Sequence, residues 1–466
     1  MQSSKMRILN IFMGLLLLSI VYPASSQDTQ DASQSDGPPQ ANTPIEHIIV
    51  LMQENHSFDN YFGTYPGANG IPEGTCMPVN PFDETITECV EPFHVSEEDV
   101  QMDDPDHSEE THRIQYNEGK MDGFVHALEL RAQDGRLAMA YYDERDLPYY
   151  WNIADNFVLF DNFFSSVHGG SFDNHMFWVA GTTVVPTREE TTQELLAETD
   201  TIFDRLEEAG LSWKFYVQNY DPELTYRTAH LYPRNRASQV IWVPLLNMDR
   251  FLDDPELNSH IVNLDEYYDD LSDGTLPNVA FMVPSGPSEH PPSNIISGQR
   301  FVRTLLQRLM QSDYWEKAVF MWTYDDWGGW YDHVPPPKVD EFGYGFRVPA
   351  LLVSSYAKKG FIDSTELDYT SILKFIQDNW DLEPLATRDA NANSIINAFD
   401  FTSPPRAAEF IPFDRGEGEV APEPRRDVIF IAYGAGIIFA LFLVFVAWYR
   451  TRSIRVRREE SLERSR

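Results

Sequence analysis

The sequence predicts an α/β fold, with a mostly parallel sheet flanked by helices and one C-terminal transmembrane helix. Apolar residues at helical spacing indicate helices at Phe301–Ser312 and Tyr369–Asn379. Buried strands that alternate with helices favour a parallel sheet, whose functional sites form at the carboxyl ends of its strands. Short, nearly continuous apolar runs are typical of such buried strands, and they occupy Ile45–Met52, Asn278–Val283, Ala318–Thr323 and Val348–Ser354.

The N-terminus, residues 1–26, is predicted to be a cleaved signal peptide. Two basic residues precede the apolar run Ile8–Val21, and the small residues that follow form a cleavage site ending at Ser26. Residues 27–42 are rich in Ser, Gln, Asp and Pro. Because they cannot bury enough apolar surface to become ordered, we expect a disordered linker before the globular domain, residues 43–415.

The C-terminal part carries a predicted membrane anchor. The apolar stretch Val428–Trp448 matches the thickness of a bilayer core at about 1.5 Å per residue, and no charged residue interrupts it. Residues 449–466 are rich in arginine, which the positive-inside rule places in the cytoplasm. The acidic segment 416–427 is expected to be a stalk. This topology places the globular domain on the outer side of the cell membrane.

The chain is strongly acidic, with 73 Asp and Glu against 35 Lys and Arg and a formal net charge of −38. Such a surface repels polyanions at long range. Nucleic acid is therefore excluded as an expected partner, and strongly anionic lipids are disfavoured as substrates. The oligomeric state does not follow from these numbers.

The chain has two cysteines, Cys76 and Cys89. Outside the cytosol such a pair usually forms a disulfide bond. The alternative is half of a metal site, but no nearby Cys or His pair completes one. We therefore predict the disulfide.

Acidic and amide side chains directly follow two of the predicted strands. Glu54 and Asn55 follow the first strand, and Asp325 and Asp326 follow Ala318–Thr323. Their oxygens are hard ligands for a divalent cation, which would also relieve the repulsion between adjacent carboxylates. The alternatives are a helix cap at the first position and a solvated acidic turn at the second. Gly328-Gly329 favours a tight turn close to a ligand.

Ser171 follows two glycines, which would present its hydroxyl on a tight turn, although a plain loop is the simpler interpretation. Histidines form a further group of candidates. An imidazole can bind phosphoryl oxygens or protonate a leaving group, but a single histidine is more often structural. The four candidates are His107, His230, His290 and His333.

Four long motifs resemble the phosphoesterase family of bacterial phospholipases C, acid phosphatase A and plant non-specific phospholipases C. In chain order they are ENHSFDNYFG, GKMDGF, TYDDWGGWYDHVPPP and GFRVPALLVSS. The resemblance extends from about Ile45 to Phe401, which makes residues 43–415 a phosphoesterase domain. It implies an alkaline-phosphatase-like fold.

The resemblance also implies roles for individual residues. Ser171 falls where relatives carry the nucleophile of a GPTxPNR-like segment. That segment reads GGSFDNH here, so Asn174 is retained and His175 replaces the arginine. His107 and His290 match histidines beside the phosphate, with Asn174, His230 and His333 as candidates for binding the substrate. The implied metal ligands are Glu54, Asn55, Asp325 and Asp326.

The expected function is metal-dependent hydrolysis of phosphate esters outside the cell. Ser171 is predicted to attack phosphorus, and His107 or His290 to protonate the leaving group. One divalent ion, calcium, magnesium or manganese, is expected as cofactor, since all three accept oxygen ligands. Two alternatives stay open. One is a phospholipase C acting on phospholipids, and the other is a catalytically inert ectodomain used for surface adhesion.

Overall fold

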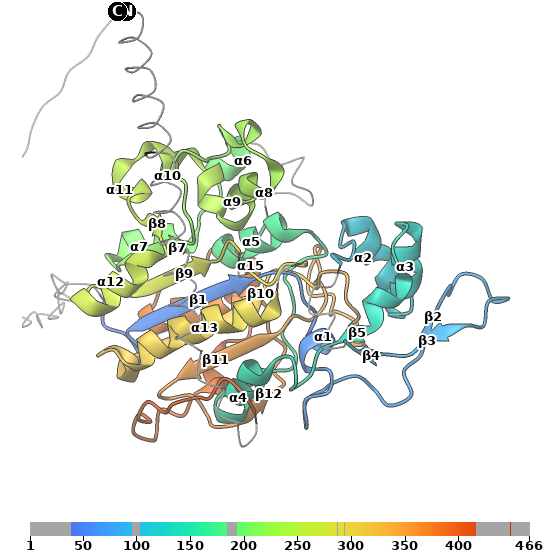
Figure 1. The fold of residues 1–466 in the computed structure, drawn as a ribbon. Coiled ribbons are helices and arrows are strands. Elements are labelled where there is room, and N and C mark those ends of the chain that lie inside the picture. Colours follow the sequence, from blue (N-terminus) through green and yellow to red (C-terminus); the bar gives the residue numbers. More distant parts are fainter. Residues whose placement is uncertain are drawn as a thin grey trace, which may run out of the picture. The chain divides into compact units, whose positions relative to one another are not determined.

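The computed structural model describes residues 39–95, 103–183, 193–286, 288–292, 294–415 and Trp448. Its centre is an eight-stranded sheet, drawn in Figure 1. From one edge to the other the strands are β12 (Phe361–Asp363), β6 (Val158–Phe160), β11 (Ala350–Ser354), β10 (Ala318–Tyr324), β1 (His47–Gln53), β9 (Val279–Val283), β7 (Trp213–Val217) and β8 (Ile261–Asn263).

The sheet is mostly parallel, as predicted. Every neighbouring pair is parallel except the two pairs made by β11, which runs against β10 and β6. The carboxyl ends of the other strands therefore meet at one edge of the sheet. The four apolar runs predicted as strands are β1, β9, β10 and β11. The remaining strands were not predicted, because three of them are only three residues long and β7 carries a lysine, Lys214.

Helices cover the sheet on both faces, since every residue of β1 and β10 is buried. One group of packed helices contains α4, α12 and α13, and another contains α5, α7, α14 and α15. Figure 1 shows α13 lying along the sheet. The bounds are α1 Phe58–Phe62, α2 Glu109–Tyr116, α3 Phe124–Leu130, α4 Pro148–Asn156, α5 Ser171–Ala180, α6 Gln193–Ala197, α7 Ile202–Ala209, α8 Arg234–Ala237, α9 Gln239–Trp242, α10 Asp249–Asp253, α11 Pro255–Asn258, α12 Asp265–Asp273, α13 Ile295–Met310, α14 Tyr369–Trp380 and α15 Thr387–Asn391.

The local sequence explains where α13 and α14 begin. Helix α13 starts at Ile295, before the predicted start at Phe301, whereas α14 starts at Tyr369 as predicted. The side chain of Asn294 accepts hydrogen bonds from two backbone N–H groups in the first turn of α13, and Asp368 caps α14 in the same way. In α13, apolar residues spaced three and four apart are buried, among them Val302, Leu305 and Leu309.

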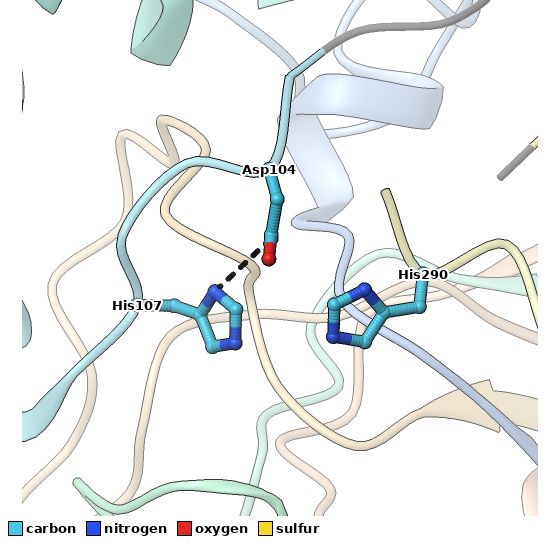
Figure 2. Close-up of side chains that lie close together, drawn as sticks. All are labelled: Asp104, His107 and His290. Atoms are coloured by element: carbon cyan, nitrogen blue, oxygen red, sulfur yellow. Dashed lines mark ion pairs between the residues drawn. The ribbon is translucent and has the colours of Figure 1, made fainter. Parts of the chain in front are cut away.

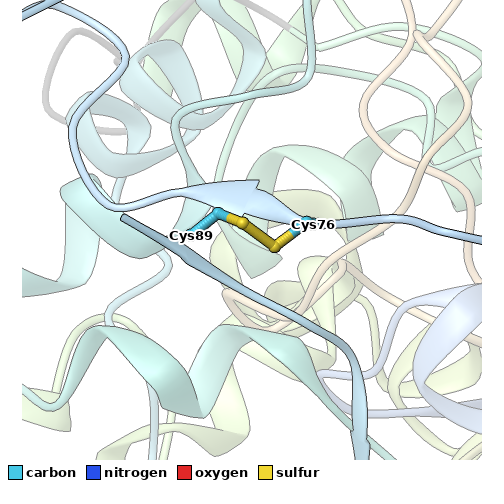
Figure 3. The surroundings of a disulfide bond; sticks show 2 residues. All are labelled: Cys76 and Cys89. Carbon is cyan, nitrogen blue, oxygen red and sulfur yellow. A yellow bond between two sulfur atoms is a disulfide. The ribbon is translucent and has the colours of Figure 1, made fainter. Parts of the chain in front are cut away.

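The predicted disulfide is confirmed. Cys76 and Cys89 are bonded, with their Cα atoms 5.4 Å apart, in a small hairpin shown in Figure 3. The hairpin pairs β2 (Met77–Pro78) with β3 (Cys89–Val90). The bond therefore closes a loop outside the main sheet, and the alternative of a half metal site is excluded.

The predicted segments at the two ends lie largely outside the described residues. This holds for the signal peptide, the stalk, the basic tail and the span 428–448 apart from Trp448. Within the part that the structure describes, no helix is both long and apolar enough to cross a membrane. Asn42, the last residue of the predicted linker, donates backbone and side-chain hydrogen bonds to Asn379 and Asp378, so ordered contacts begin before Thr43.

Candidate active site

Two neighbouring parallel strands bring the candidate metal ligands together. In the register of β1 and β10, Gln53 lies opposite Tyr324, so Glu54-Asn55 and Asp325-Asp326 leave the sheet side by side. The Asn55 backbone N–H donates to Asp325 Oδ1 at 3.2 Å. The structure thus brings the two pairs together at the carboxyl edge of the sheet, although Asn55 and Asp325 are 270 positions apart in the chain.

Three carboxyl groups are buried at this point. Glu54 is 3% exposed, and Asp325 and Asp326 are fully buried. Burial, followed by repulsion from Asp326, raises the pKa of Asp325 to about 7, and burial likewise raises the pKa of Asp326 to about 7. Burial and the charges of both aspartates raise the pKa of Glu54 well above its ordinary value. Buried carboxylates packed together in this way require a compensating positive charge at neutral pH.

The same residues carry buried oxygens that lack a hydrogen bond. Among the described residues, Asn55 Oδ1, Asp325 Oδ2 and Asp326 Oδ2 have no donor within normal geometry. Buried polar atoms are nearly always paired, so unpaired oxygens are a sign of a missing ligand. Carboxylate and amide oxygens are the ligands that calcium, magnesium and manganese prefer. The residues present therefore fit a divalent cation.

The orientation of Asn55 is fixed by its neighbours. Its Nδ2 lies 2.9 Å from His107 Nε2, and His107 Nδ1 lies 2.8 Å from the Pro105 carbonyl oxygen. Because His107 Nδ1 donates to that carbonyl, its Nε2 accepts from Asn55 Nδ2, and Asn55 Oδ1 is left without a donor. Asn55 has a left-handed backbone, with φ 67°, and is fully buried, so its NHS glycosylation sequon is inaccessible in the folded protein.

The predicted glycine turn encloses Asn55 from the other side. Gly328 has φ +61°, and a Cβ there would lie 2.2 Å from the Asn55 carbonyl oxygen. A side chain at this position would therefore push Asn55 out of place. The Gly328 N–H also donates to Asp326 Oδ1 at 2.8 Å, which orients that carboxylate.

Ser171 is the first residue of α5, after Gly170 in an extended conformation. Its hydroxyl faces Asp325 and Asp326 closely enough to lower the pKa of both carboxyls. It completes no hydrogen bond of good geometry with Asp325 Oδ2 or Asp326 Oδ2. The structure thus places the predicted nucleophile beside the predicted metal ligands.

His107 and His290 lie next to one another, with Asp104 beside them (Figure 2). One ligand-type atom from each of the three residues lies within 4.8 Å of the others, and His107 Nδ1 is 3.6 Å from Asp104 Oδ1. His290 Nδ1 is 2.7 Å from the Pro291 carbonyl oxygen, to which it donates, so its reactive nitrogen is Nε2. Asp104 was not predicted, although its place three residues before His107 is a signal that could have found it.

Glu289 holds the backbone of His290 in place, and the sequence analysis missed it. Its carboxylate is fully buried and accepts hydrogen bonds from the hydroxyls of Tyr61, Tyr150 and Tyr324. Its carbonyl oxygen lies 3.0 Å from His56 Nε2. Glu289 has φ 69°, a costly conformation for a non-glycine residue, so these contacts determine the direction in which the chain enters His290.

Replacing Glu289 with alanine should lower the free energy of unfolding by about 3 kcal/mol or more, because three buried tyrosyl hydroxyls would lose their acceptor. Glu289→Gln, which keeps one acceptor oxygen and the volume, should lose less. Urea denaturation of both variants measures this. Glu46→Ala, which removes an exposed partner of Lys317, is the control and should change stability by less than about 1 kcal/mol. Wild-type stability of Glu289→Ala would contradict this role.

The structure gives the remaining predicted residues other surroundings. Asn174 is buried, and its Oδ1 accepts from the backbone of Ser166 and Val167, so it shapes the loop before Ser171. His333 Nδ1 is 2.7 Å from Asp59 Oδ2. His230 is exposed in the short 3₁₀ helix Ala229–Leu231. None of these three has a side-chain contact with the Asp325-Asp326 pair among the interactions found within the described residues.

Two further groups could hold a metal by spacing alone. In the first, Asp59, Asp332 and His333 already surround the buried guanidinium of Arg347, which pairs with both aspartates. In the second, His94 is 2.6 Å from Asp146 and also faces Asp143, which is paired with Arg145. In both groups the carboxylates already have partners within the protein, unlike Oδ2 of Asp325 and of Asp326.

His175 stands where the family pattern has arginine. It belongs to α5, and its side chain is fully buried. Its Nε2 is 3.9 Å from Asp325 Oδ2, and burial lowers the pKa of the imidazole to about 3. The ring is therefore neutral at physiological pH. It cannot replace the positive charge of an arginine as a clamp for phosphate.

Comparisons with known proteins identify relatives of this chain. Phospholipase C B of Mycobacterium tuberculosis is 29% identical over 79% of this chain and 80% of its own length. Non-specific phospholipase C1 of Arabidopsis thaliana is 26% identical over 83% of this chain and 76% of its own length.

A solved structure, a protein of the alkaline phosphatase superfamily from Vibrio parahaemolyticus, aligns with 73% of this chain and 68% of its own at 12% identity and a TM-score of 0.36. The alkaline-phosphatase-like arrangement stays a prediction. The model of the phosphoesterase family matches residues 45–383, which is most of the chain and includes all the candidate site residues. The chain therefore belongs to the phosphoesterase family and is a hydrolase of phosphate esters.

Proposed function

We propose that this protein hydrolyses phosphate esters through Ser171 and with the help of one divalent cation. The observation that supports this most directly is the convergence of Ser171 on the buried Asp325-Asp326 pair, whose outer oxygens lack hydrogen bonds. Calcium, magnesium or manganese would be held by Glu54, Asn55, Asp325 and Asp326. When bound, such an ion supplies charge that lowers the pKa of the Ser171 hydroxyl and neutralises a phosphoryl oxygen.

The chain's own groups carry the steps. Ser171 Oγ gives its proton to a solvent water and attacks phosphorus in line, and the bond from phosphorus to the leaving oxygen breaks. His290 Nε2 gives the leaving oxygen a proton. His290 Nε2 then takes a proton from the water that attacks the phosphoserine. The bond from phosphorus to Ser171 Oγ breaks, and that oxygen takes a proton back from solvent. Positioning and charge stabilisation supply most of the rate in such reactions.

His290 is the better candidate for the proton donor. Both nitrogens of His107 are engaged, one with Pro105 and the other with Asn55. His107 therefore orients the amide of Asn55, whereas His290 has Nε2 directed away from its backbone contact. We assign proton transfer to His290 and a positioning role to His107.

A phospholipid is the second candidate substrate. The relatives described above are named phospholipases C, and both align over most of their length. Phosphatidylcholine vesicles therefore belong beside soluble esters in any assay. Release of diacylglycerol from these vesicles would favour the phospholipase C activity over a phosphatase restricted to small esters.

Hydrolysis of p-nitrophenyl phosphate tests the proposed function. After treatment with EDTA the protein should be inactive, and calcium, magnesium or manganese should restore activity. Full activity in EDTA would contradict the metal requirement. Inactivity with every ester and every metal would favour the inert ectodomain.

We also propose that the phosphoesterase domain lies outside the cell, on a single C-terminal anchor. The support is the apolar stretch 428–448, followed by the arginine-rich tail. Protease added to intact cells should remove the domain and leave residues 450–466 protected. Protection of the domain would contradict this topology.

A further inference from the structure

A polar pocket lies next to the candidate active site and takes no part in the mechanism above. Its volume is about 280 Å³, and it opens where β7 and β9 end. We call it the Trp242 pocket. Six of the residues that line it matter here. Gln218, Asn219 and Ser285 follow these strands, and Asn235, Arg236 and Trp242 belong to α8 and α9.

Three connections join the Trp242 pocket to the candidate active site. The side chain of Trp242 lies close enough to the carboxylate of Glu54 to lower the pKa of that carboxyl group. Helix α9, which ends at Trp242, packs against α5, which begins at Ser171. Ser285 follows the strand that leads to His290, and the Ser288 carbonyl between them accepts from the Glu54 N–H at 2.9 Å. The pocket and the site therefore share a wall.

The distance from the Trp242 pocket to the candidate active site can be spanned by one substituent of a phosphate ester. Strand β9 separates β7 from β1, and neighbouring strands lie about 4.8 Å apart, so the pocket is roughly 10 Å from the strand that carries Glu54. A phosphoryl group beside Asp325 and Asp326 would place its second ester substituent within reach of the pocket.

The lining selects for a neutral ligand that forms hydrogen bonds. The charges of Arg236 and Asp221 cancel in an ion pair of 2.8 Å. Asn219 Nδ2 donates to Ser285 Oγ at 2.6 Å, and Gln218 Oε1 accepts from the Ser285 N–H. Within the described residues this leaves Asn219 Oδ1, Gln218 Nε2 and the Ser285 hydroxyl proton without a protein partner, ready to accept from and donate to hydroxyl groups.

We propose that the Trp242 pocket binds a neutral, hydroxyl-rich substituent of the phosphate ester, such as glycerol. This assignment rests on the proposed function. A cationic head group would find no unpaired carboxylate in the lining. An acyl chain would leave the amide groups that line the pocket without hydrogen-bond partners. The pocket would thus determine which esters are cleaved fastest, while Ser171 and its neighbours carry out the reaction.

Three phosphodiesters with the same leaving group, p-nitrophenol, test the proposal. Their second substituents are glycerol, choline and methyl. We expect kcat/KM for the glycerol ester to exceed that for the other two by about tenfold or more, the effect of one or two satisfied hydrogen bonds. Asn219→Ala and Ser285→Ala should each lower the ratio of glycerol to methyl ester about tenfold.

A folding defect does not change this ratio, because misfolded protein loses activity on the glycerol ester and on the methyl ester to the same extent. Asn235→Ala is the third variant, since its side chain is exposed and it should lower the ratio without a folding defect. Ser272→Ala, an exposed serine of α12 that does not line the pocket, should keep the wild-type ratio.

Equal rates for the three esters, preference for the choline ester, or an unchanged ratio in all three pocket variants would overturn the proposal while the proposed function stands. Failure to hydrolyse any of the esters with any metal would overturn both.

Discussion

Ser171→Ala should lower kcat by about three or more orders of magnitude, the scale seen when a covalent nucleophile is removed. The change deletes one oxygen that faces Asp325 and Asp326. Ser171 is only half-buried at the start of α5, so the free energy of unfolding should stay within about 0.5 kcal/mol. Ser171→Thr should retain more activity, because it keeps a hydroxyl. Quenched-flow trapping of the wild-type protein should recover phosphate on Ser171.

Two neighbouring serines provide matched controls. Ser165 Oγ donates to the Phe346 carbonyl, and Ser166 Oγ donates to Asp368 at 2.8 Å. Both hydroxyls are buried in these contacts, so their alanine variants should lose stability without losing the phosphoserine. If Ser171→Ala hydrolyses ester at the wild-type rate, the covalent mechanism is wrong and water is the attacking group.

Asp326→Asn should abolish most metal binding and activity while making the metal-free protein more stable at neutral pH. The substitution keeps Oδ1 for the Gly328 N–H but removes one of three buried acidic groups. Without metal those groups repel one another, and with metal the lost charge weakens binding. Calorimetric titration with manganese and thermal unfolding with and without EDTA measure the two effects.

The pH dependence of the metal-free protein follows from the same groups. Burial raises the pKa of Asp325 and Asp326 from 3.8 to about 7. Between about pH 4 and pH 7 the folded protein therefore holds protons that the unfolded chain has released, so stability falls as pH rises through this window. Asp326→Asn should make this loss of stability smaller, by on the order of 1 kcal/mol or more of unfolding free energy at pH 8.

Asp332→Asn is the matched control for the changes in metal binding and in the stability of the metal-free protein. Asp332 is equally buried, but it pairs with Arg347 at 2.9 Å. Removing its charge should destabilise the protein with or without metal, because part of the guanidinium loses its partner. An Asp326→Asn protein with unchanged metal affinity and activity would refute the metal site.

The sequence by itself determined the α/β fold and placed the acidic candidate residues at the ends of two strands. Continuous apolar runs that alternate with helices indicate strands buried between two layers of helices, and polar residues directly after such strands lie at the edge of the sheet. For this reason Glu54-Asn55 and Asp325-Asp326 were expected at one edge of the sheet, and Asn55 lies against Asp325 there. The two cysteines of the chain predicted their disulfide bond, which the structure confirms. These inferences need only local pattern and composition.

The tertiary structure alone decided how the histidines and amides are used. The sequence predicts His107 and His290 as catalytic candidates and His230 and His333 as candidates for binding the substrate. The contacts of each imidazole, however, come from the tertiary structure. His333 packs against Asp59, and His107 lies against Asn55. Trp242 likewise carries no sequence signal, because its link to Glu54 exists only once α9 has packed on α5. Hydrogen-bond partners, and with them tautomers and unpaired oxygens, depend on contacts between distant segments, which no local pattern encodes.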